Sequence, residues 1–260
     1  MLHNKEEALS QLYKLCDNDI QADLLKDLII RFNCFDEEIY NLILTSIAKY
    51  IISLGYPPDE TAIVAFAPNH EADSSQVMLQ YLKVVMGMEG MPYPITINRF
   101  DRISKAYHKQ NIRHFIAVDE FIGSGRTIIN RNDFFQKLGL TSATIDFCIM
   151  AGMNEAIEIV KKEGISLHVE YDIKKGISQY YNGDKLITYT EEMRKLEAKL
   201  AKKINGTLLT DYNFGFGRAE SLFTTLHGNI PNNVFPVFWW KIDSNQNKRV
   251  TLFTRVQDGY

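Results

Sequence analysis

One segment restricts the possible folds of this chain more than any other: four apolar residues, Phe115 to Val118, run directly into the adjacent carboxylates Asp119 and Glu120. A short apolar run bounded by turn-forming residues is typical of a fully buried strand in a parallel sheet. Because an unpaired buried carboxylate is unfavourable, two acids at this position indicate a polar ligand, a metal ion or a cleft. In open α/β sheets such a ligand lies at the carboxyl ends of the strands.

A loop of small residues follows one further apolar pair and leads into a segment, 127–138, that can start a helix. The loop consists of Gly123, Ser124, Gly125, Arg126 and Thr127. Its backbone N–H groups, two hydroxyls and helix N-terminus together favour phosphate binding. It is not a P-loop, because no Gly-Lys-Ser/Thr follows the glycines. The alternative interpretation is a buried strand, a polar turn and a capped helix without a ligand.

The order and spacing of these residues resemble the phosphoribosyltransferase signature, in which four apolar, two acidic and two apolar residues precede a Thr/Ser/Gly loop that closes on Thr. The resemblance implies that Asp119 and Glu120 hold the ribose hydroxyls of phosphoribosyl diphosphate, and that the loop 123–127 wraps its 5′-phosphate. Arg126 occupies a position that the family usually fills with a small residue. The implied chemistry is transfer or cleavage at C1 of a 5-phosphoribosyl group.

Apolar runs alternate with amphipathic segments along the chain, which predicts an α/β fold with a doubly wound, mainly parallel sheet of phosphoribosyltransferase type. The expected strands cover residues 62–67, 94–98, 115–118, 143–150 and 165–172. The expected helices of this region cover residues 76–86, 104–110, 127–138 and 155–162. We expect a core at 57–173, a helical N-terminal extension at 1–56 and an α+β C-terminal cap at 174–260 that completes the cleft.

Two helices outside the core have clear apolar stripes, which we interpret as packing surfaces. The first begins at the predicted N-cap Asp36 and ends at Gly55. Its stripe is Ile39, Leu42, Ile43, Ile47, Tyr50, Ile51 and Leu54. The second is expected to start at Thr190, with the stripe Met193, Leu196, Leu200 and Ile204.

The loop after the first expected strand of the sheet is where the resemblance places the diphosphate. The candidate contacts in it are Asn69, His70, Ser74 and Ser75. The loop lacks the basic residue and glycine usual in the family, and only His70 can carry positive charge. Its acids, Glu71 and Asp73, would repel diphosphate unless Mg²⁺ intervenes, so we expect substrate-bound Mg²⁺ and no direct protein ligand to the metal. Ser74 and Ser75 can also simply cap the next helix, which we favour slightly.

An aromatic segment near the C-terminus, residues 231–241, contains the amides Asn232 and Asn233 and two adjacent tryptophans. Packing in the core, with the segment as an edge strand, is the expected role of most of its aromatic residues. Asn232, Asn233 and Trp240 are nevertheless candidate contacts to a base. Together with the signature, this segment resembles the phosphoribosyltransferase-like proteins of bacterial conflict systems, including those encoded beside retron reverse transcriptases. That finer resemblance covers residues from about 62 to the C-terminus and implies antiphage partner proteins.

Composition excludes several other classes of function. The formal net charge is −3 and there is no basic tract, so nothing indicates direct nucleic-acid binding. No apolar stretch is long enough to span a bilayer, and the N-terminus lacks the layout of a signal peptide. Three scattered cysteines without a C-x-x-C pair favour a reducing, cytoplasmic location.

Three functions stay open on the sequence. The chain is expected to be an enzyme that binds a phosphorylated ribose or nucleotide and reacts it at C1. It can instead be a sensor that binds phosphoribosyl diphosphate or a nucleotide without chemistry. The third is a toxin that cleaves a nucleotide glycosidic bond and is held in check by partners. Because one fold hosts many functions, the sugar-phosphate site is a firmer inference than the reaction.

Overall fold

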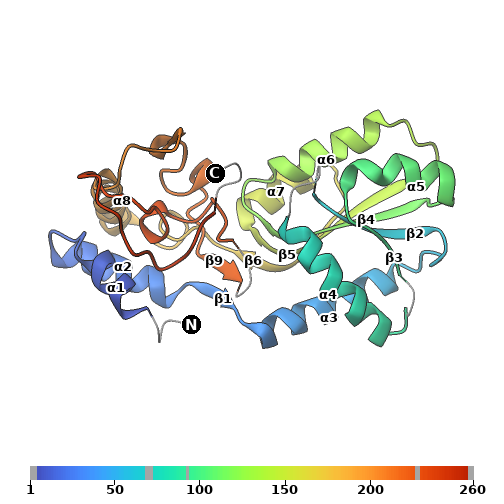
Figure 1. Ribbon diagram of the computed structural model, residues 1–260, viewed down its shortest axis with the longest axis horizontal. Coiled ribbons are helices and arrows are strands. Elements are labelled where there is room, and N and C mark those ends of the chain that lie inside the picture. Colours follow the sequence, from blue (N-terminus) through green and yellow to red (C-terminus); the bar gives the residue numbers. More distant parts are fainter. Residues whose placement is uncertain (1–4, 68–72, 92–93, 226–228, 257–260) are drawn as a thin grey trace. The chain divides into compact units, whose positions relative to one another are not determined.

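The computed structural model describes residues 5–67, 73–91, 94–225 and 229–256 (Figure 1). The chain forms two compact units. The first, here called the sheet unit, is Asp36–Asp172, and the second, the terminal unit, combines Met1–Phe35 with Ile173–Tyr260. The expected boundary at residue 56 therefore differs from the observed division, because the first two helices pack with the C-terminal part of the chain while the third packs with the sheet.

The sheet unit contains a five-stranded sheet with the strand order β3-β2-β4-β5-β6. Its strands are β2 (Thr61–Ala65), β3 (Ile95–Ile97), β4 (His114–Ile122), β5 (Thr144–Met153) and β6 (Leu167–Ile173). The ladders that join β3 to β2, β2 to β4 and β4 to β5 are parallel. The predicted doubly wound, mainly parallel α/β sheet is thereby confirmed.

The sheet changes its winding direction between β2 and β4. The chain leaves β2 for its neighbour β3 at one edge, and then returns to build β4, β5 and β6 in the opposite direction. Such a switch point opens a crevice at the carboxyl ends of the two strands that flank it. Here β2 ends at Ala65, opposite Val118, whereas β4 continues to Ile122 beside β5 alone. Asp119 and Glu120 therefore stand beyond the end of β2, beside this crevice.

Helices cover both faces of the sheet (Figure 1). On one face lie α3 (Glu37–Ser53) and α4 (Ser74–Met88). On the other lie α5 (Ile103–Gln110), α6 (Arg126–Lys137) and α7 (Asn154–Lys162), with the short 3₁₀ helix η2 (Phe100–Arg102) before α5. Between these layers the strand residues Phe115 to Val118 are completely buried. No helix in the described ranges combines the length and apolarity needed to cross a bilayer.

Helix α3 begins as predicted, because the Asp36 side chain accepts a hydrogen bond from the N–H of Ile39 at 2.9 Å. Its expected buried stripe is partly wrong, since Ile39 and Leu42 are 39% and 64% exposed. The buried face is instead formed by Tyr40, Leu44, Ile47, Ala48 and Ile51. Apolar residues line both faces of this helix, so periodicity alone does not fix its rotation. The rotation of α3 is fixed by the packing of Tyr40 toward the sheet.

The terminal unit contains the helices α1 (Glu6–Tyr13), α2 (Asp19–Ile30) and α8 (Gly183–Ala198). Its short strands pair as β1 (Asn33–Phe35) with β9 (Phe223–Thr225), and as β7 (Lys203–Ile204) with β8 (Thr207–Leu208). Its described residues also include the 3₁₀ helices η3 (Leu209–Asp211), η4 (Phe216–Arg218) and η5 (Pro236–Phe238). The sequence did not predict β1.

Helix α8 differs from its prediction at both ends. It starts after the N-cap Asn182, so Thr190 lies inside the helix, and it ends at Ala198, before Leu200 and Ile204. The aromatic segment that follows forms η5 where an edge strand was expected. Its rings are nevertheless core, as predicted. They pack with α1, α2 and α8 through the buried side chains of Phe235, Phe238, Trp239 and Trp240.

Candidate functional site

The two carboxylates of the signature leave β4 in opposite directions, because successive side chains of a strand point to opposite faces of the sheet. Glu120 lies on the α3 face, where it meets Tyr40. Asp119 is within electrostatic range of Arg131 on α6. The Asp119 Oδ1 atom accepts a hydrogen bond from the backbone N–H of Glu120 at 2.8 Å. The pair therefore occupies one edge of the sheet, but only Asp119 is partly exposed while Glu120 is buried.

Tyr40 holds Glu120 in place. Its hydroxyl donates to Glu120 Oε1 at 2.7 Å, and both side chains are buried. Burial raises the pKa of Glu120 to about 7, although the Tyr40 hydrogen bond opposes this rise. A carboxyl with a pKa near neutrality can exchange a proton under ordinary conditions, which is a common property of functional sites. Sequence reasoning missed Tyr40 because the residue was placed in an N-terminal extension, outside the core.

Asp119 is the more strongly perturbed acid. Burial raises its pKa well above the usual range, and the nearby negative charge of Asp73 raises it further. Asp73 also raises the pKa of Glu120. Three carboxyl groups thus share one edge of the sheet with little positive charge to offset them. Such a cluster favours a ligand that brings hydroxyl donors or a cation.

The loop 123–127 connects β4 to the first turn of α6, as predicted. Gly125 is the N-cap of α6, and no side chain caps the helix there. Its first internal hydrogen bond runs from Ile129 N–H to the Gly125 carbonyl at 3.1 Å. The N–H groups of residues 126–128 therefore have no acceptor within the helix. Arg126 and Thr127 are exposed, and these N–H groups give this helix end a partial positive charge suited to an anion.

Gly125 has a structural role besides any contact with a ligand. Its φ angle is +76°, and a Cβ atom built on it would lie 2.9 Å from Val160 Cγ2 and 3.1 Å from the Ala156 carbonyl oxygen. Both neighbours belong to α7. Only glycine lets the N-terminus of α6 approach α7 this closely in this backbone conformation.

We therefore expect Gly125→Ala to lower the free energy of unfolding by about 1–3 kcal/mol more than Gly139→Ala does, because of the added clash. Gly139 has a similar φ of +61° but open space around it, so it is a matched control for the backbone strain. Urea denaturation measures both variants. Equal losses would contradict the packing role.

Arg131 supplies positive charge that the sequence analysis did not assign to the site. It lies on α6, and its Nε atom donates to the Phe66 carbonyl at 3.1 Å, just after the end of β2. Its guanidinium carbon is 5.3 Å from the centre of the Phe100 ring. Burial lowers the pKa of Arg131, while Asp73 and Asp119 oppose this. Arg131 follows Thr127 by four residues, so the two side chains lie on the same face of α6. This spacing was the sequence signal that could have placed Arg131 beside the loop.

The described part of the predicted diphosphate loop is built as a helix cap. Asp73 is the N-cap of α4, and it forms a reciprocal capping box with Gln76. Ser75 is buried and its Oγ atom accepts from the N–H of Ala67 at 3.2 Å, whereas Ser74 is exposed. The capping oxygen comes from Asp73, not from either serine. The other two candidates, Asn69 and His70, lie outside the described residues.

The predicted base contacts all lie in the terminal unit, where they have structural partners. Trp240 is 1% exposed and its indole N–H donates to the Ala201 carbonyl at 3.0 Å. The Asn233 amide donates to the Phe216 carbonyl at 2.9 Å, and the Asn232 carbonyl accepts from Phe216 N–H at 2.8 Å. These bonds fasten the segment to η4. The asparagines therefore shape the backbone of this unit, and their role toward a base stays a prediction.

No group of three or more His, Cys, Asp or Glu side chains within residues 5–67, 73–91, 94–225 and 229–256 is arranged to hold a metal ion. Asp73, Asp119 and Glu120 interact electrostatically without forming such a group. Any Mg²⁺ at this edge needs ligand oxygens to complete its coordination.

Comparison with known proteins places the chain in a family. The model of the PRTase-CE family matches residues 9–255, which cover the sheet unit and most of the terminal unit. No curated protein matches the chain.

Several solved structures share distant similarity. A xanthine-guanine-hypoxanthine phosphoribosyltransferase of Helicobacter pylori has 9% identity and a TM-score of 0.37, over 55% of this chain and 85% of that one. An orotate phosphoribosyltransferase of Aeropyrum pernix has 13% identity and a TM-score of 0.35, over 61% and 78% of the two chains. A hypothetical protein of Neisseria gonorrhoeae with bound ppGpp has 12% identity and a TM-score of 0.37, over 65% and 98%. The match to the family model, not these likenesses, carries the assignment.

Proposed function

Because the chain belongs to the PRTase-CE family, we propose that it binds a 5-phosphoribosyl compound between β2 and β4 and acts at C1 of the sugar. The observation that carries the proposal is the position of the acidic pair. Asp119 and Glu120 lie past the end of β2, beside a helix N-terminus whose N–H groups have no acceptor within the helix. A phosphorylated sugar matches this arrangement, with a phosphate for the N–H groups and hydroxyls for the acids.

In this proposal each group has one task. The N–H groups of residues 126–128 bind the 5′-phosphate, with the Ser124 and Thr127 hydroxyls beside them. Asp119 accepts hydrogen bonds from the ribose hydroxyls, and Tyr40 positions Glu120. As the bond from C1 to its leaving group breaks, the sugar gains positive charge, which these carboxylates stabilise. The acceptor then forms its bond to C1, and the leaving group departs with the electron pair.

Substrate-bound Mg²⁺ belongs to the proposal as a companion of a diphosphate. It would offset the phosphate charge beside Asp73, held mainly by oxygens of the diphosphate, because the described side chains make no metal site of their own. Arg131 lies beside the end of β2 and adds a cation on the same side. The predicted contacts of Asn69 and His70 to the diphosphate remain part of this proposal.

A second candidate function is binding of the ligand without a reaction. It is favoured by the protonation of Asp119 and Glu120. Burial raises the pKa of Glu120 to about 7 and that of Asp119 well above its usual range, so both carboxyls can be neutral in the free protein. A neutral pair binds sugar hydroxyls but stabilises a developing cation poorly. Under this candidate the chain is a sensor of phosphoribosyl diphosphate or of a nucleotide.

The biological setting is proposed from sequence resemblance alone. The signature and the aromatic segment resemble proteins of bacterial conflict systems, some of them encoded beside retron reverse transcriptases. In that setting the chain is a cytoplasmic antiphage effector whose reaction at C1 cleaves the glycosidic bond of a nucleotide, and partner proteins hold this activity in check. Asn232, Asn233 and Trp240, in the C-terminal segment, remain candidate contacts to a base on this resemblance.

One incubation separates these candidates. The protein is mixed with phosphoribosyl diphosphate, Mg²⁺ and a panel of bases, and separately with a panel of nucleotides, and the products are read by mass spectrometry. A new nucleotide with released diphosphate supports transfer, and a free base with ribose 5-phosphate supports cleavage. Ligand binding in calorimetry with no product supports the sensor. The absence of both product and binding would contradict the proposed function.

A further inference from the structure

The terminal unit contains a pocket that the proposed reaction at C1 does not use. It lies between the last turns of α8 and residues 208–213, and its volume is about 530 Å³. Pockets that bind small molecules commonly measure about 300–1,000 Å³. The residues that line it are Arg194, Glu197, Ala198, Lys202, Leu208, Leu209, Thr210 and Asn213. The pocket therefore has the size and the mixed chemistry of a site for a small organic molecule.

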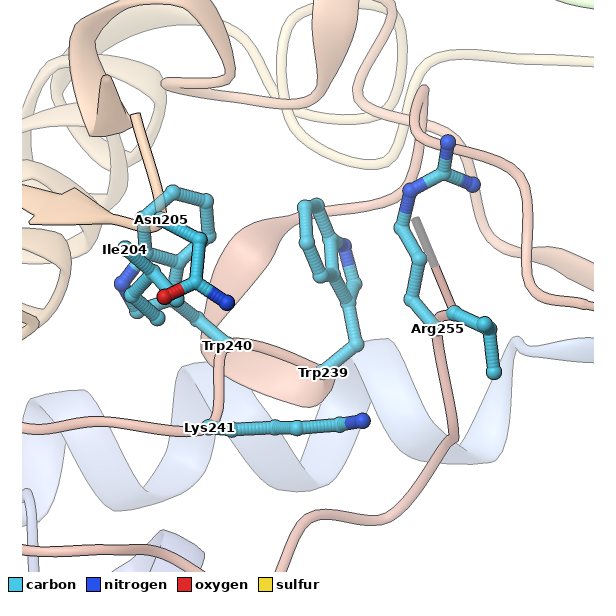
Figure 2. Close-up of a pocket in the computed structure, with 7 residues that line it drawn as sticks. Ile204, Asn205, Trp239, Trp240, Lys241 and Arg255 are labelled. Carbon is cyan, nitrogen blue, oxygen red and sulfur yellow. The ribbon is translucent and has the colours of Figure 1, made fainter. Parts of the chain in front are cut away.

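Another pocket of this unit, with a volume of about 190 Å³, is lined by groups that already have partners (Figure 2). Trp239 and Trp240 are 3% and 1% exposed, and their indole N–H groups donate to backbone carbonyls at 2.9 and 3.0 Å. Arg255 donates to the Ile230 carbonyl at 2.6 Å. The larger pocket beside α8 is different in this respect.

The rim of the larger pocket, formed by Arg194, Lys202, Thr210 and Asn213, carries polar groups that are available to a ligand. The first three are exposed and Asn213 is half-buried. The side chains of Lys202, Thr210 and Asn213 make no hydrogen bond or ion pair with a described residue. The Arg194 guanidinium carbon is 6.0 Å from the centre of the Phe214 ring, a contact that leaves its N–H donors unused.

Hydrogen bonds hold the two walls of this pocket together without a ligand. The Phe214 N–H donates to Glu197 Oε1 at 2.9 Å and so ties residues 208–213 to α8. The Leu209 N–H donates to the Lys202 carbonyl at 2.9 Å. Leu209 is buried in the wall, whereas Leu208 is 46% exposed and offers apolar surface. A wall that is fixed in advance loses little conformational freedom on binding, which favours affinity.

Glu197 is the one acid among the described lining residues, and it is only 2% exposed. Its Oε2 atom has no hydrogen-bond partner among the described residues, which disfavours the charged form. Burial raises the pKa of Glu197 to about 8, and the charge of Glu220 adds to this rise, while the Phe214 N–H and Arg218 oppose it. At neutral pH this carboxyl is therefore mainly protonated, so it does not cancel the positive charge of the rim.

We propose that this pocket binds a phosphate monoester with a small apolar body, its phosphate at Arg194 and Lys202 and its body against Ala198 and Leu208. The two cations match the charge of such a phosphate, about −1.5 to −2 at pH 7. Guanidinium and ammonium groups are the usual protein partners of phosphate oxygens, and the hydroxyl and amide of the rim add further hydrogen bonds. The inference does not depend on the reaction at C1 and requires no contact between the two units.

Backbone NMR of the labelled full chain tests the proposal with three probes. Phenyl phosphate has the charge and the body, phenyl sulfate has the same body with one charge, and inorganic phosphate has no body. We expect phenyl phosphate to shift the amides of residues 208–213 saturably. Phenyl sulfate should bind about tenfold more weakly, the order expected for loss of one charged hydrogen bond.

The same spectra identify the outcomes that would overturn the proposal. Equal affinity for inorganic phosphate would show an adventitious ion only. Shifts confined to residues 124–128 would place the phosphate in the sheet unit, which contradicts this inference but not the proposed function.

A pair of lysine variants locates the phosphate. Lys202→Ala should weaken binding of phenyl phosphate about tenfold. Lys203→Ala is the matched control, because Lys203 is an adjacent exposed lysine on β7 that does not line the pocket. Equal effects of the two variants would contradict the assignment of the phosphate to Lys202.

Glu197→Gln tests the floor of the pocket. The amide keeps an oxygen for the Phe214 N–H and stays neutral at every pH. In the native chain, Glu197 becomes negative as the pH rises from 7 to 9 through its pKa of about 8, and it then repels the phosphate. Binding of phenyl phosphate should therefore weaken over this range in the native chain and change far less in Glu197→Gln. The same pH dependence in both proteins would overturn the placement of the phosphate above Glu197.

Discussion

Asp119→Asn is expected to reduce turnover of a phosphoribosyl substrate at least about 10²-fold, the scale of one lost electrostatic contact to a transition state. The protein should remain folded and become more stable at neutral pH. Asparagine keeps an oxygen for the N–H of Glu120, while it removes a carboxyl whose charged form is disfavoured by desolvation and by Asp73. Removing such a charge commonly exchanges activity for stability. Steady-state kinetics and thermal unfolding measure the two effects on one sample.

Asp133→Asn provides the matched control. Asp133 is exposed on α6, so its replacement makes the same change in charge without touching the site. We expect turnover and the midpoint of unfolding to stay near those of the native chain. Full activity in Asp119→Asn, or its unfolding, would contradict the proposed role of Asp119.

The second large effect is expected from Tyr40→Phe, measured as a shift in pH dependence. The Tyr40 hydrogen bond lowers the pKa of Glu120 from the higher value that burial alone would give, so its removal raises this pKa above about 7. The limb of the kcat/KM profile that Glu120 sets should therefore move to higher pH. Loss of the bond also leaves a buried carboxyl unpartnered, which costs about 1–3 kcal/mol of stability.

Tyr81→Phe separates the hydrogen bond from simple packing. Tyr81 lies on α4 with its ring centre 6.0 Å from that of Tyr40, and its replacement removes a hydroxyl from the same aromatic pair. The pH profile of this control should not move. A Tyr40→Phe profile that coincides with that of Tyr81→Phe would show that Tyr40 does not tune Glu120.

Ionisation of Glu120 makes the stability of the folded chain depend on pH in a definite direction. Its pKa is raised from 4.5 to about 7 by folding, so the folded chain binds the proton more tightly than the unfolded chain. Stability is therefore fully present below the unfolded pKa and declines as the pH rises through about 7. Glu120→Gln should remove this decline and unfold at a higher temperature than the native chain above that pH.

Sequence predicted the elements that local patterns determine. The buried strand, the acidic pair, the loop into α6 and the N-cap Asp36 depend on residues close together in the chain. The doubly wound, mainly parallel sheet also followed, because alternating strands and helices restrict the topology to few right-handed arrangements. These features were sufficient to locate the edge of the sheet where a ligand is proposed.

The residues that complete this edge were not predictable, because they come from distant segments. Tyr40 reaches Glu120 only through the rotation of α3, and Arg131 reaches Phe66 only through the packing of α6 on the sheet. Helix α3 has apolar residues on both faces, so its periodicity did not distinguish the buried face from the exposed one. Asn232 and Asn233 were predicted to contact a base, whereas the bonds of the Asn233 amide and of the Asn232 backbone carbonyl to Phe216 depend on the tertiary fold.

The central claim is that the sheet edge between β2 and β4 holds a 5-phosphoribosyl group by its phosphate. Backbone NMR of the labelled full chain, titrated with ribose 5-phosphate and then with ribose, tests it most directly. We predict that ribose 5-phosphate produces its largest amide shifts at residues 124–128, with smaller ones at Asp119 and Glu120, and that ribose moves the loop amides far less. Equal shifts with both sugars, or shifts confined to other parts of the chain, would contradict the account.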